Sequence, residues 1–233
     1  MKQKDGCLSI AVLCAGAVLA KYLIVLPEYM VKYNANAAWI TALLKNLVAF
    51  LFLFIIIRLY APFEGQSLEA VASLALGGFG RTLLNISYAA GFMLFNAALF
   101  RILIEALKTV NHLGAAYEYY ALFIAAAVVC AAFIGIKSVT NISAVVFPLI
   151  VLSIALISII MIPHYRLYNI MPFFGSGISE IGRSLTSRLF GYSEYSLLFF
   201  LAPHIGKNRS LRKAAAISVG TVTFFSVGFT LLY

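Results

Sequence analysis

The chain has 233 residues, of which 63% are hydrophobic and only 11% charged, and its mean hydropathy is +1.00. A soluble domain of this length would need more charged side chains to cover its surface, so the composition indicates a membrane protein. A net charge of +9 can indicate nucleic-acid binding, but here the basic residues lie in short gaps between apolar runs and not on one face, which argues against it.

Seven apolar runs are long enough to cross a bilayer, since a spanning helix needs roughly 20 apolar residues. They cover residues 7–26, 37–60, 82–107, 119–136, 142–162, 185–205 and 214–233. The runs are continuous and do not alternate with a period of two, which argues against strands. The first could be a signal peptide, but it continues past Lys21 and further runs follow it. We therefore expect an all-α membrane protein with residues 1–233 in one integral-membrane domain.

The basic residues also indicate the orientation of the chain. With the N-terminus in the cytoplasm, the inner loops hold Lys2, Lys4, Arg58, Arg81, Lys137, Lys207, Arg209, Arg212 and Lys213. The outer loops then hold only Lys32, Lys108, Arg166 and Arg183. The positive-inside rule favours this topology. Two amphipathic segments, residues 67–77 and 177–186, are expected to lie along the membrane surface.

Polar residues interrupt the sixth run, where Gly191 and Tyr192 are followed by Glu194. An ionised carboxylate costs about 2.5–3.5 kcal/mol or more at the centre of a spanning helix. Glu194 is therefore expected to face protein or a water-filled cavity, with a cation, a proton or an amine as its partner. The alternative is a protonated or paired glutamate without a role in ligand binding.

The first and sixth runs share a pattern of an internal glycine followed by a proline. Gly16 precedes Pro27, and Gly191 precedes Pro203. The sixth run lies five runs after the first. This spacing fits the first helices of two inverted repeats, an architecture in which broken helices meet at the membrane midplane and bind substrate. Glycine also serves as a packing residue in membrane helices, and this second reading stays open at both positions.

Two lysines fall inside apolar runs. Lys21 flanks the expected break of the first helix, where it could take the place of a coupling cation or pair with Glu194. Lys45 lies about a turn from the midpoint of the second run, and we expect it to extend outward to the membrane surface.

The third run carries two sets of polar residues. Arg101 and Glu105 are four residues apart and are expected to pair on one helix face, as a structural element or an outer gate. With roughly 100° per residue, Glu105 falls nearly opposite Asn96. Asn96 together with Phe100 is therefore the better candidate for lining a cavity.

The sequence contains no recognisable catalytic or metal-binding set, and we expect no enzyme, metal or cofactor. It lacks a phosphate-binding glycine loop, and its serines have no histidine or aspartate at a spacing typical of a nucleophile site. The histidines and cysteines, which lack metal-ligand or disulfide spacing, are His112, His164, His204, Cys7, Cys14 and Cys130.

Ordered motifs along nearly the whole chain resemble one family. They are Leu26-Pro27, Ala38-Trp39-Ile40, Ser67-Leu68-Glu69, Leu99-Phe100-Arg101 with Glu105, Tyr168-Asn169-Ile170-Met171-Pro172, Gly191-Tyr192-Ser193-Glu194, Leu201-Ala202-Pro203 and the basic turn from Lys207 to Lys213. The sequence resembles the endospore germination permeases, the B-type subunits of nutrient germinant receptors. These belong to the amino acid/polyamine/organocation transporter superfamily.

The resemblance implies a ten-helix fold of two inverted five-helix repeats with broken helices 1 and 6. The chain departs from this pattern in two ways. It supplies only seven spans and ends inside the last, so we expect that the C-terminal helices are missing and that the chain is truncated. Ala20-Lys21-Tyr22 also stands where the family usually has a glycine-containing break, with Gly16 upstream.

The function that the resemblance implies is a receptor subunit that binds a nutrient germinant, such as an amino acid, within the membrane. It would signal to A and C subunits in the spore inner membrane. The alternatives are a proton- or cation-coupled amino acid permease with Glu194 as the titrating group, and a fragment or structural partner without a ligand. The expected ligand-binding residues are Gly16, Ala17, Lys21, Asn96, Phe100, Gly191, Tyr192 and Glu194.

Overall fold

The computed structural model describes residues 7–21, 35–111, 116–164, 177–187, 194–205 and 207–232. Every regular element in these residues is a helix, which confirms the predicted all-α class. The chain forms two compact units, Met1–Gln66 with Ser143–Tyr233 and Ser67–Ile142. The two units are described separately below.

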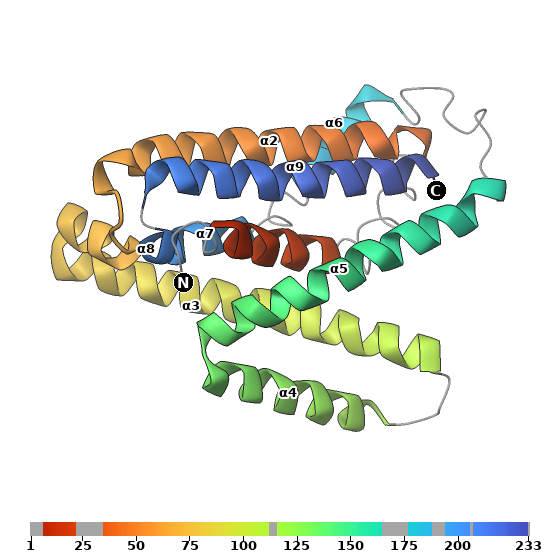
Figure 1. The fold of residues 1–233 in the computed structure, drawn as a ribbon, viewed down its shortest axis with the longest axis horizontal. Helices are drawn as coiled ribbons and strands as arrows, with labels where there is room; N and C mark the ends of the chain where they lie inside the picture. The colour runs from red at the N-terminus through yellow and green to blue at the C-terminus, as the bar shows by residue number, and fades with distance from the viewer. Residues whose placement is uncertain are drawn as a thin grey trace. The chain divides into compact units, whose positions relative to one another are not determined.

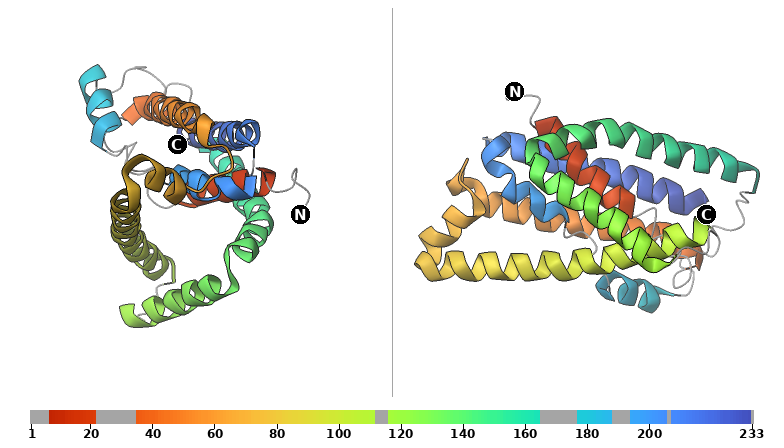
Figure 2. Two further views of the ribbon diagram at one scale, coloured as in Figure 1. Left: turned by 90° about the vertical axis from the view of Figure 1, so that its left-hand side faces the viewer. Right: turned by 90° about the horizontal axis from the view of Figure 1, so that it is seen from below.

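An antiparallel helix pair forms the centre of the first unit. Helix α2 (Ala38–Tyr60) follows the short η1 (Ala35–Ala37) and continues into η2 (Ala61–Phe63). Helix α9 (Asn208–Leu232) runs alongside α2 in the opposite direction, as Figures 1 and 2 show. Small residues at the start of α2 allow this close approach.

In the core of this pair, small side chains of α2 pack against larger side chains of α9. Ala38 and Ala42, which are 2% and 0% exposed, pack against Val227 and Phe229 of α9. At the other end of α2, the ring of Tyr60 meets the ring of Phe199 edge-on, with 5.8 Å between centroids. The pair therefore provides the frame on which shorter segments of the unit are held.

Those shorter segments come from both ends of the chain. The N-terminal helix, Cys7–Lys21, is tied to the start of α9 by a hydrogen bond in which Cys7 Sγ donates to the Ser210 carbonyl over 3.1 Å. After α6 (Ile178–Ser187), a 3-10 turn at residues 194–196 leads into α7 (Leu197–Phe200) and α8 (Ala202–Ile205).

The predicted sixth span is therefore not a continuous helix in its described residues. Helices α7 and α8 have four residues each and are separated by a bend at Leu201. Pro203 occupies the second position of α8, where its missing N–H removes no helical hydrogen bond. This bend lies ten residues after Gly191, where the break was predicted, and Gly191 itself lies outside the described residues.

The second unit contains α3 (Leu68–Asn111) and α4 (Tyr117–Ile134). Helix α3 bends at Gly77, whose φ of 66° and ψ of −159° are not helical and suit only glycine. Across the bend, Arg81 Nη2 lies 3.3 Å from Glu69 Oε2. The bend sets the predicted surface segment at residues 67–77 apart from the third apolar run.

Helix α5 (Ile136–Met161) begins in the second unit and continues into the first. It starts six residues before the predicted fifth span, because Gly135, with a φ of 86°, ends α4 and lets the next helix begin at once. Pro148 lies inside α5, and η3 (Ile162–His164) follows it.

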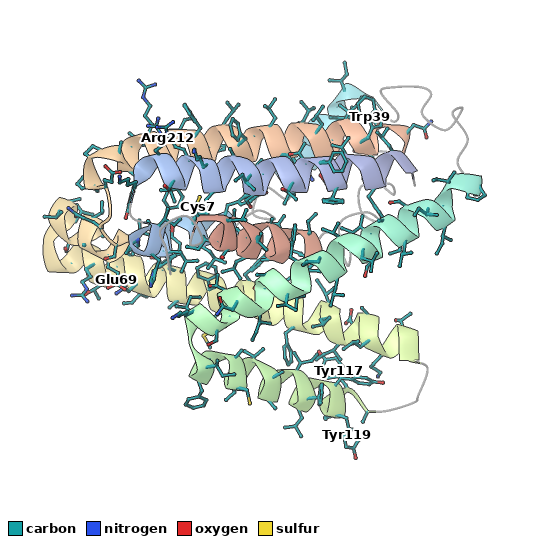
Figure 3. All side chains as sticks on the ribbon, viewed as in Figure 1. Cys7, Trp39, Glu69, Tyr117, Tyr119 and Arg212 are labelled. Atoms are coloured by element: carbon teal, nitrogen blue, oxygen red, sulfur yellow. The ribbon has the colours of Figure 1, made fainter. Side chains whose placement is uncertain are left out.

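Five helices in the described part of the chain are long and apolar enough to cross a membrane. They are Ala38–Phe63, Leu68–Thr109, Tyr117–Ile134, Ile136–Met161 and Arg209–Leu231, and Cys7–Lys21 is a shorter apolar helix. Helix α4 buries none of its residues, and its apolar side chains Phe123 and Phe133 are 79% and 89% exposed. Tyr119, at the start of α4 (Figure 3), is 72% exposed, as suits an aromatic ring at the edge of a membrane.

Candidate functional site

A buried ion pair joins the two segments that the sequence singled out. Lys21 Nζ lies 2.6 Å from Glu194 Oε1 and donates a second hydrogen bond to Oε2 over 2.7 Å. The two side chains are only 7% and 9% exposed. This contact confirms the predicted pairing of Lys21 with Glu194. Both oxygens of the carboxylate are satisfied by one ammonium group, which is how a protein stabilises a buried charge.

The elements that carry this pair are themselves anchored in the core. Lys21 ends the described N-terminal helix, one helical face of which is buried through Cys14 and Val18, both 0% exposed. Glu194 begins the 3-10 turn that leads into α7, where Leu198 is also 0% exposed. The ion pair thus connects two short helical segments that approach from opposite ends of the chain.

Gly16 and Ala17 lie on the same N-terminal helix as Lys21. Gly16 is buried inside a continuous helix, and a Cβ added to it would meet the ring of Phe147 at 3.6 Å. This is an ordinary van der Waals distance, so packing against α5 does not by itself require glycine here, and the described helix does not break at Gly16. Ala17 is half-buried. The other two expected site residues of the first unit, Gly191 and Tyr192, lie outside the described residues.

The remaining candidates belong to α3 in the second unit. Asn96 is exposed and donates from Nδ2 to the Phe92 carbonyl over 2.8 Å, while Phe100 is half-buried. Arg101 Nε lies 3.0 Å from Glu105 Oε1, which confirms the predicted pair. Its side chains are 75% and 57% exposed, so this pair resembles a surface salt bridge. The role of Asn96 and Phe100 in ligand binding stays a prediction.

The expectation for Lys45 was wrong. Lys45 does not extend outward but is 1% exposed, because it lies on the buried side of α2. Its neighbours on this side, Thr41 and Asn46, are 0% and 1% exposed. Asn46 Nδ2 donates to Ser226 Oγ of α9, and Ser226 is 0% exposed. We call this buried polar contact between α2 and α9 the polar seam.

The sequence contains a signal for the polar seam that the analysis of single lysines missed. Thr41 and Lys45 are four residues apart and Asn46 follows directly, so all three share one side of α2. Ser218, Ser226 and Thr230 recur at multiples of four along the last apolar run. Two polar stripes of this kind indicate helices that pack on each other, because polar side chains in a bilayer need protein partners.

No group of three or more histidine, cysteine, aspartate or glutamate side chains in the described residues could hold a metal ion. The chemistry available at the Lys21–Glu194 pair is therefore that of one ammonium and one carboxylate, which can exchange partners with a charged ligand. The fold and this pair together define a class of protein: a helical, transporter-like membrane protein with a buried ion pair.

The sequence matches the spore germination protein family (Spore_permease) over residues 7–233, and the chain belongs to this family. Members of this family are permease-like membrane proteins and not enzymes. The chain is thus an integral membrane protein of this family, and the resemblance identified from its motifs is confirmed.

A curated relative supports the same assignment. The chain is 22% identical over 221 residues to Spore germination protein B2 of Bacillus subtilis (strain 168). The match covers 92% of this chain and 58% of the relative, so the chain spans less than two thirds of that protein's length. No solved structure matches the chain.

Proposed function

We propose that the chain is a receptor subunit that binds a small nutrient germinant, such as an amino acid, within the membrane and signals to partner subunits. The observation that supports this proposal most directly is the buried Lys21–Glu194 pair. An amino acid carries one carboxylate and one ammonium, which are the charge complements of Lys21 and Glu194. Such a ligand could replace one internal ion pair with two pairs to itself.

This exchange supplies a way to transmit a signal. In the free protein Lys21 and Glu194 hold the N-terminal helix to the segment before α7. A ligand between the two charges would separate these segments and so would bind one conformation better than the other. Differential binding of this kind is what any ligand-driven change requires. The partner subunits, of A and C types by resemblance, would read the change in the spore inner membrane.

The same pair bears on the alternative of a cation-coupled permease. The Lys21 ammonium already contacts both oxygens of Glu194, so an inorganic cation would have to displace it. A permanent internal cation therefore favours a receptor over a cation-coupled permease. A proton-coupled permease stays as the alternative in which Glu194 titrates.

Reconstitution in sealed liposomes with labelled amino acids separates these functions. We expect saturable binding that survives gentle detergent lysis and no accumulation inside the vesicles. Label that is released by lysis would establish a permease instead. If no amino acid is retained in either state, the proposed binding function is wrong.

The Glu194→Gln variant tests the site itself. We expect it to weaken amino acid binding by about tenfold or more, since a charge-assisted bond is lost inside a low-dielectric site. Glu105→Gln is the matched control, because Glu105 also pairs with a basic side chain but is 57% exposed. Equal affinities of the wild-type and Glu194→Gln proteins would remove Glu194 from the site.

A further inference from the structure

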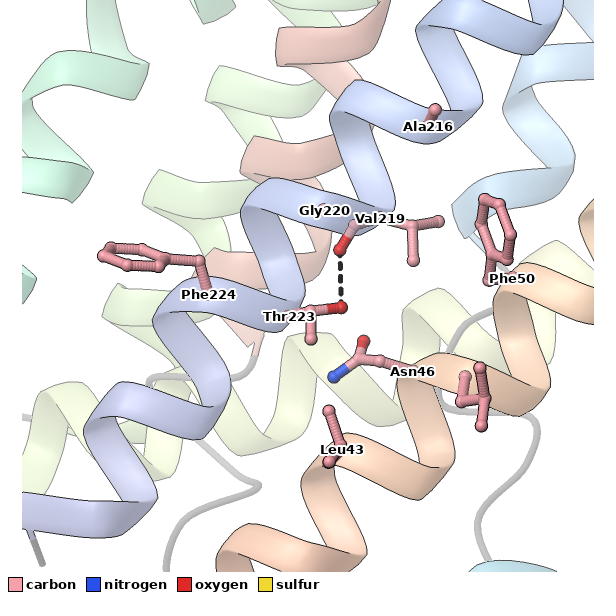
Figure 4. Close-up of a pocket in the computed structure, with 9 residues that line it drawn as sticks. Leu43, Asn46, Phe50, Ala216, Val219, Gly220, Thr223 and Phe224 are labelled. Carbon is pink, nitrogen blue, oxygen red and sulfur yellow. Dashed lines mark hydrogen bonds between the residues drawn. The ribbon is translucent and has the colours of Figure 1, made fainter.

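An open groove lies between α2 and α9, apart from the Lys21–Glu194 pair. Its volume is about 410 Å³. Apolar walls are formed by Leu43, Leu47 and Phe50 of α2 and by Val219, Gly220 and Phe224 of α9 (Figure 4). Leu47 and Phe224 are 51% and 74% exposed, so the mouth of the groove faces outward from the helix pair.

The position of the groove along both helices places it at membrane depth. Its residues lie well inside the apolar helices Ala38–Phe63 and Arg209–Leu231, with Gly220 near the middle of the second. A molecule in the groove would therefore enter sideways from the hydrocarbon of the bilayer. From Leu43 to Phe50 the groove extends for about 10 Å at a rise of about 1.5 Å per residue, which suits a medium-length apolar chain.

Asn46 lines the groove, and one of its polar atoms has no hydrogen-bond partner among the described residues. Asn46 is 1% exposed, and its Nδ2 donates to the Ala42 carbonyl and to Ser226 Oγ, each over 2.9 Å. Because a carbonyl oxygen can only accept, the atom facing Ala42 must be the NH₂ group, and this fixes Oδ1 as the other atom. Oδ1 is buried and has no hydrogen-bond partner among the described residues.

The other polar groups around the groove do not supply a donor for this oxygen. The Thr223 hydroxyl donates to the Val219 carbonyl over 2.7 Å, which Figure 4 shows as a dashed line. The Ser226 hydroxyl donates to the Thr223 carbonyl over 3.2 Å. The groove thus combines an apolar wall with an acceptor whose donor is absent, a combination that selects molecules with an N–H or O–H group.

The groove has no charged lining residue, which excludes the amino acids proposed as ligands of the Lys21–Glu194 site. None of its lining residues is ionisable. A zwitterion would leave two charges unpaired in the low-dielectric part of the membrane, so the groove does not suit a free amino acid.

We propose that the α2–α9 groove is a second binding site, which takes a neutral amphiphile with one O–H or N–H donor and an apolar chain. The apolar chain lies along Leu47 and Phe224, and the donor bonds to Asn46 Oδ1. The ligand reaches the site from the bilayer and contacts both helices of the central pair.

Photolabelling of the chain in lipid nanodiscs tests this proposal. The probes are a photoreactive medium-chain primary alcohol and its methyl ether, which has the same chain and an acceptor but no donor. We expect the alcohol to label peptides of α2 and α9 saturably, with the ether weaker by about tenfold. Equal labelling by both probes would show a non-selective acyl-chain groove and would overturn the proposal.

Two substitutions test the apolar groove and its hydrogen-bond acceptor independently. Gly220→Leu fills the groove, because a Cβ at Gly220 meets no atom within 4 Å. Gly228→Leu is the control: it also meets open space on α9 but does not line the groove. Labelling should be lost in the first variant and kept in the second.

Asn46→Leu removes the acceptor and should make labelling by the alcohol equal to labelling by the ether, while the ether signal stays unchanged. Wild-type labelling of Gly220→Leu, or label on peptides outside α2 and α9, would contradict the assignment.

Discussion

Lys21 and Glu194 stabilise each other at a place where neither would be tolerated alone. The two side chains are 7% and 9% exposed, and three atoms, one nitrogen and two oxygens, make up the contact. Removal of water from two ions is costly, and the attraction between them offsets that cost only while both are present. The free energy of the pair is therefore best measured by removing its members one at a time and together.

A double-mutant cycle makes this argument quantitative. Lys21→Met or Glu194→Gln alone should destabilise the protein by about 3–5 kcal/mol, because each leaves one buried charge without its partner. The double variant should be less destabilised than either single variant, since both charges are gone. Thermal unfolding in detergent micelles would measure the three differences. Additive losses would mean that the two side chains act independently.

At the scale of helices, α3 shows how one residue divides a long apolar element. Gly77 adopts a backbone conformation that a residue with a Cβ strongly disfavours, and the helix changes direction there. Gly80 follows closely, and a Cβ added to it would come within 2.8 Å of the Ala72 carbonyl and also clash with Leu76. Both glycines are thus required by the bend and not by the spanning helix.

Substitution of glycine within α3 should therefore have opposite effects at two positions. Gly77→Ala should destabilise the protein by about 1–3 kcal/mol, because φ near 66° strains an alanine. Gly91→Ala, in the helical part of α3 with open space around it, should stabilise the helix by about 0.5–1 kcal/mol. Circular dichroism during heating would compare the two. A stable Gly77→Ala protein would contradict the bend.

Prediction from the sequence succeeded for elements whose signal is local. The long apolar runs at residues 37–60 and 119–136 correspond closely to α2 and α4, because length and composition decide helices in a bilayer. It failed for Lys45, since burial depends on which helix packs against α2. In the structure α2 packs along α9, and apolar periodicity along one chain does not state which helices pair.

The candidate site was predictable only in part for the same reason. Glu194 and Lys21 each stood out as an ionisable residue in an apolar run, and a buried charge needs an opposite one. The groove beside Asn46 had no comparable signal, because asparagine carries no charge and its free oxygen depends on side-chain geometry.

At the scale of the whole molecule, the basic residues at the start of α9 predict the orientation of the chain in the membrane. Lys207, Arg209, Arg212 and Lys213 are exposed, and Arg212 extends away from the helix (Figure 3). We predict that this end lies in the cytoplasm together with the N-terminus, because basic loops are retained on that side.

Cysteine labelling in intact spheroplasts would test this orientation. On a background without Cys7, Cys14 and Cys130, Arg212→Cys should react with an impermeant maleimide only after the membrane is permeabilised. Tyr119→Cys, at the opposite side in this topology and 72% exposed, should react in intact cells. The reverse pattern would invert the topology.

The pairing of α2 with α9 also implies a delay during biosynthesis between the insertion of α2 and its packing against α9. Asn46 and its partner Ser226 are 180 residues apart in the chain. At about 5–20 residues per second, roughly 10–35 s pass between the synthesis of α2 and the arrival of α9. During this interval the buried amide of Asn46 lacks the helix that carries its partner. Helix α2 therefore remains in the bilayer without its packing partner until α9 has been synthesised, and the insertion machinery has to retain it until then.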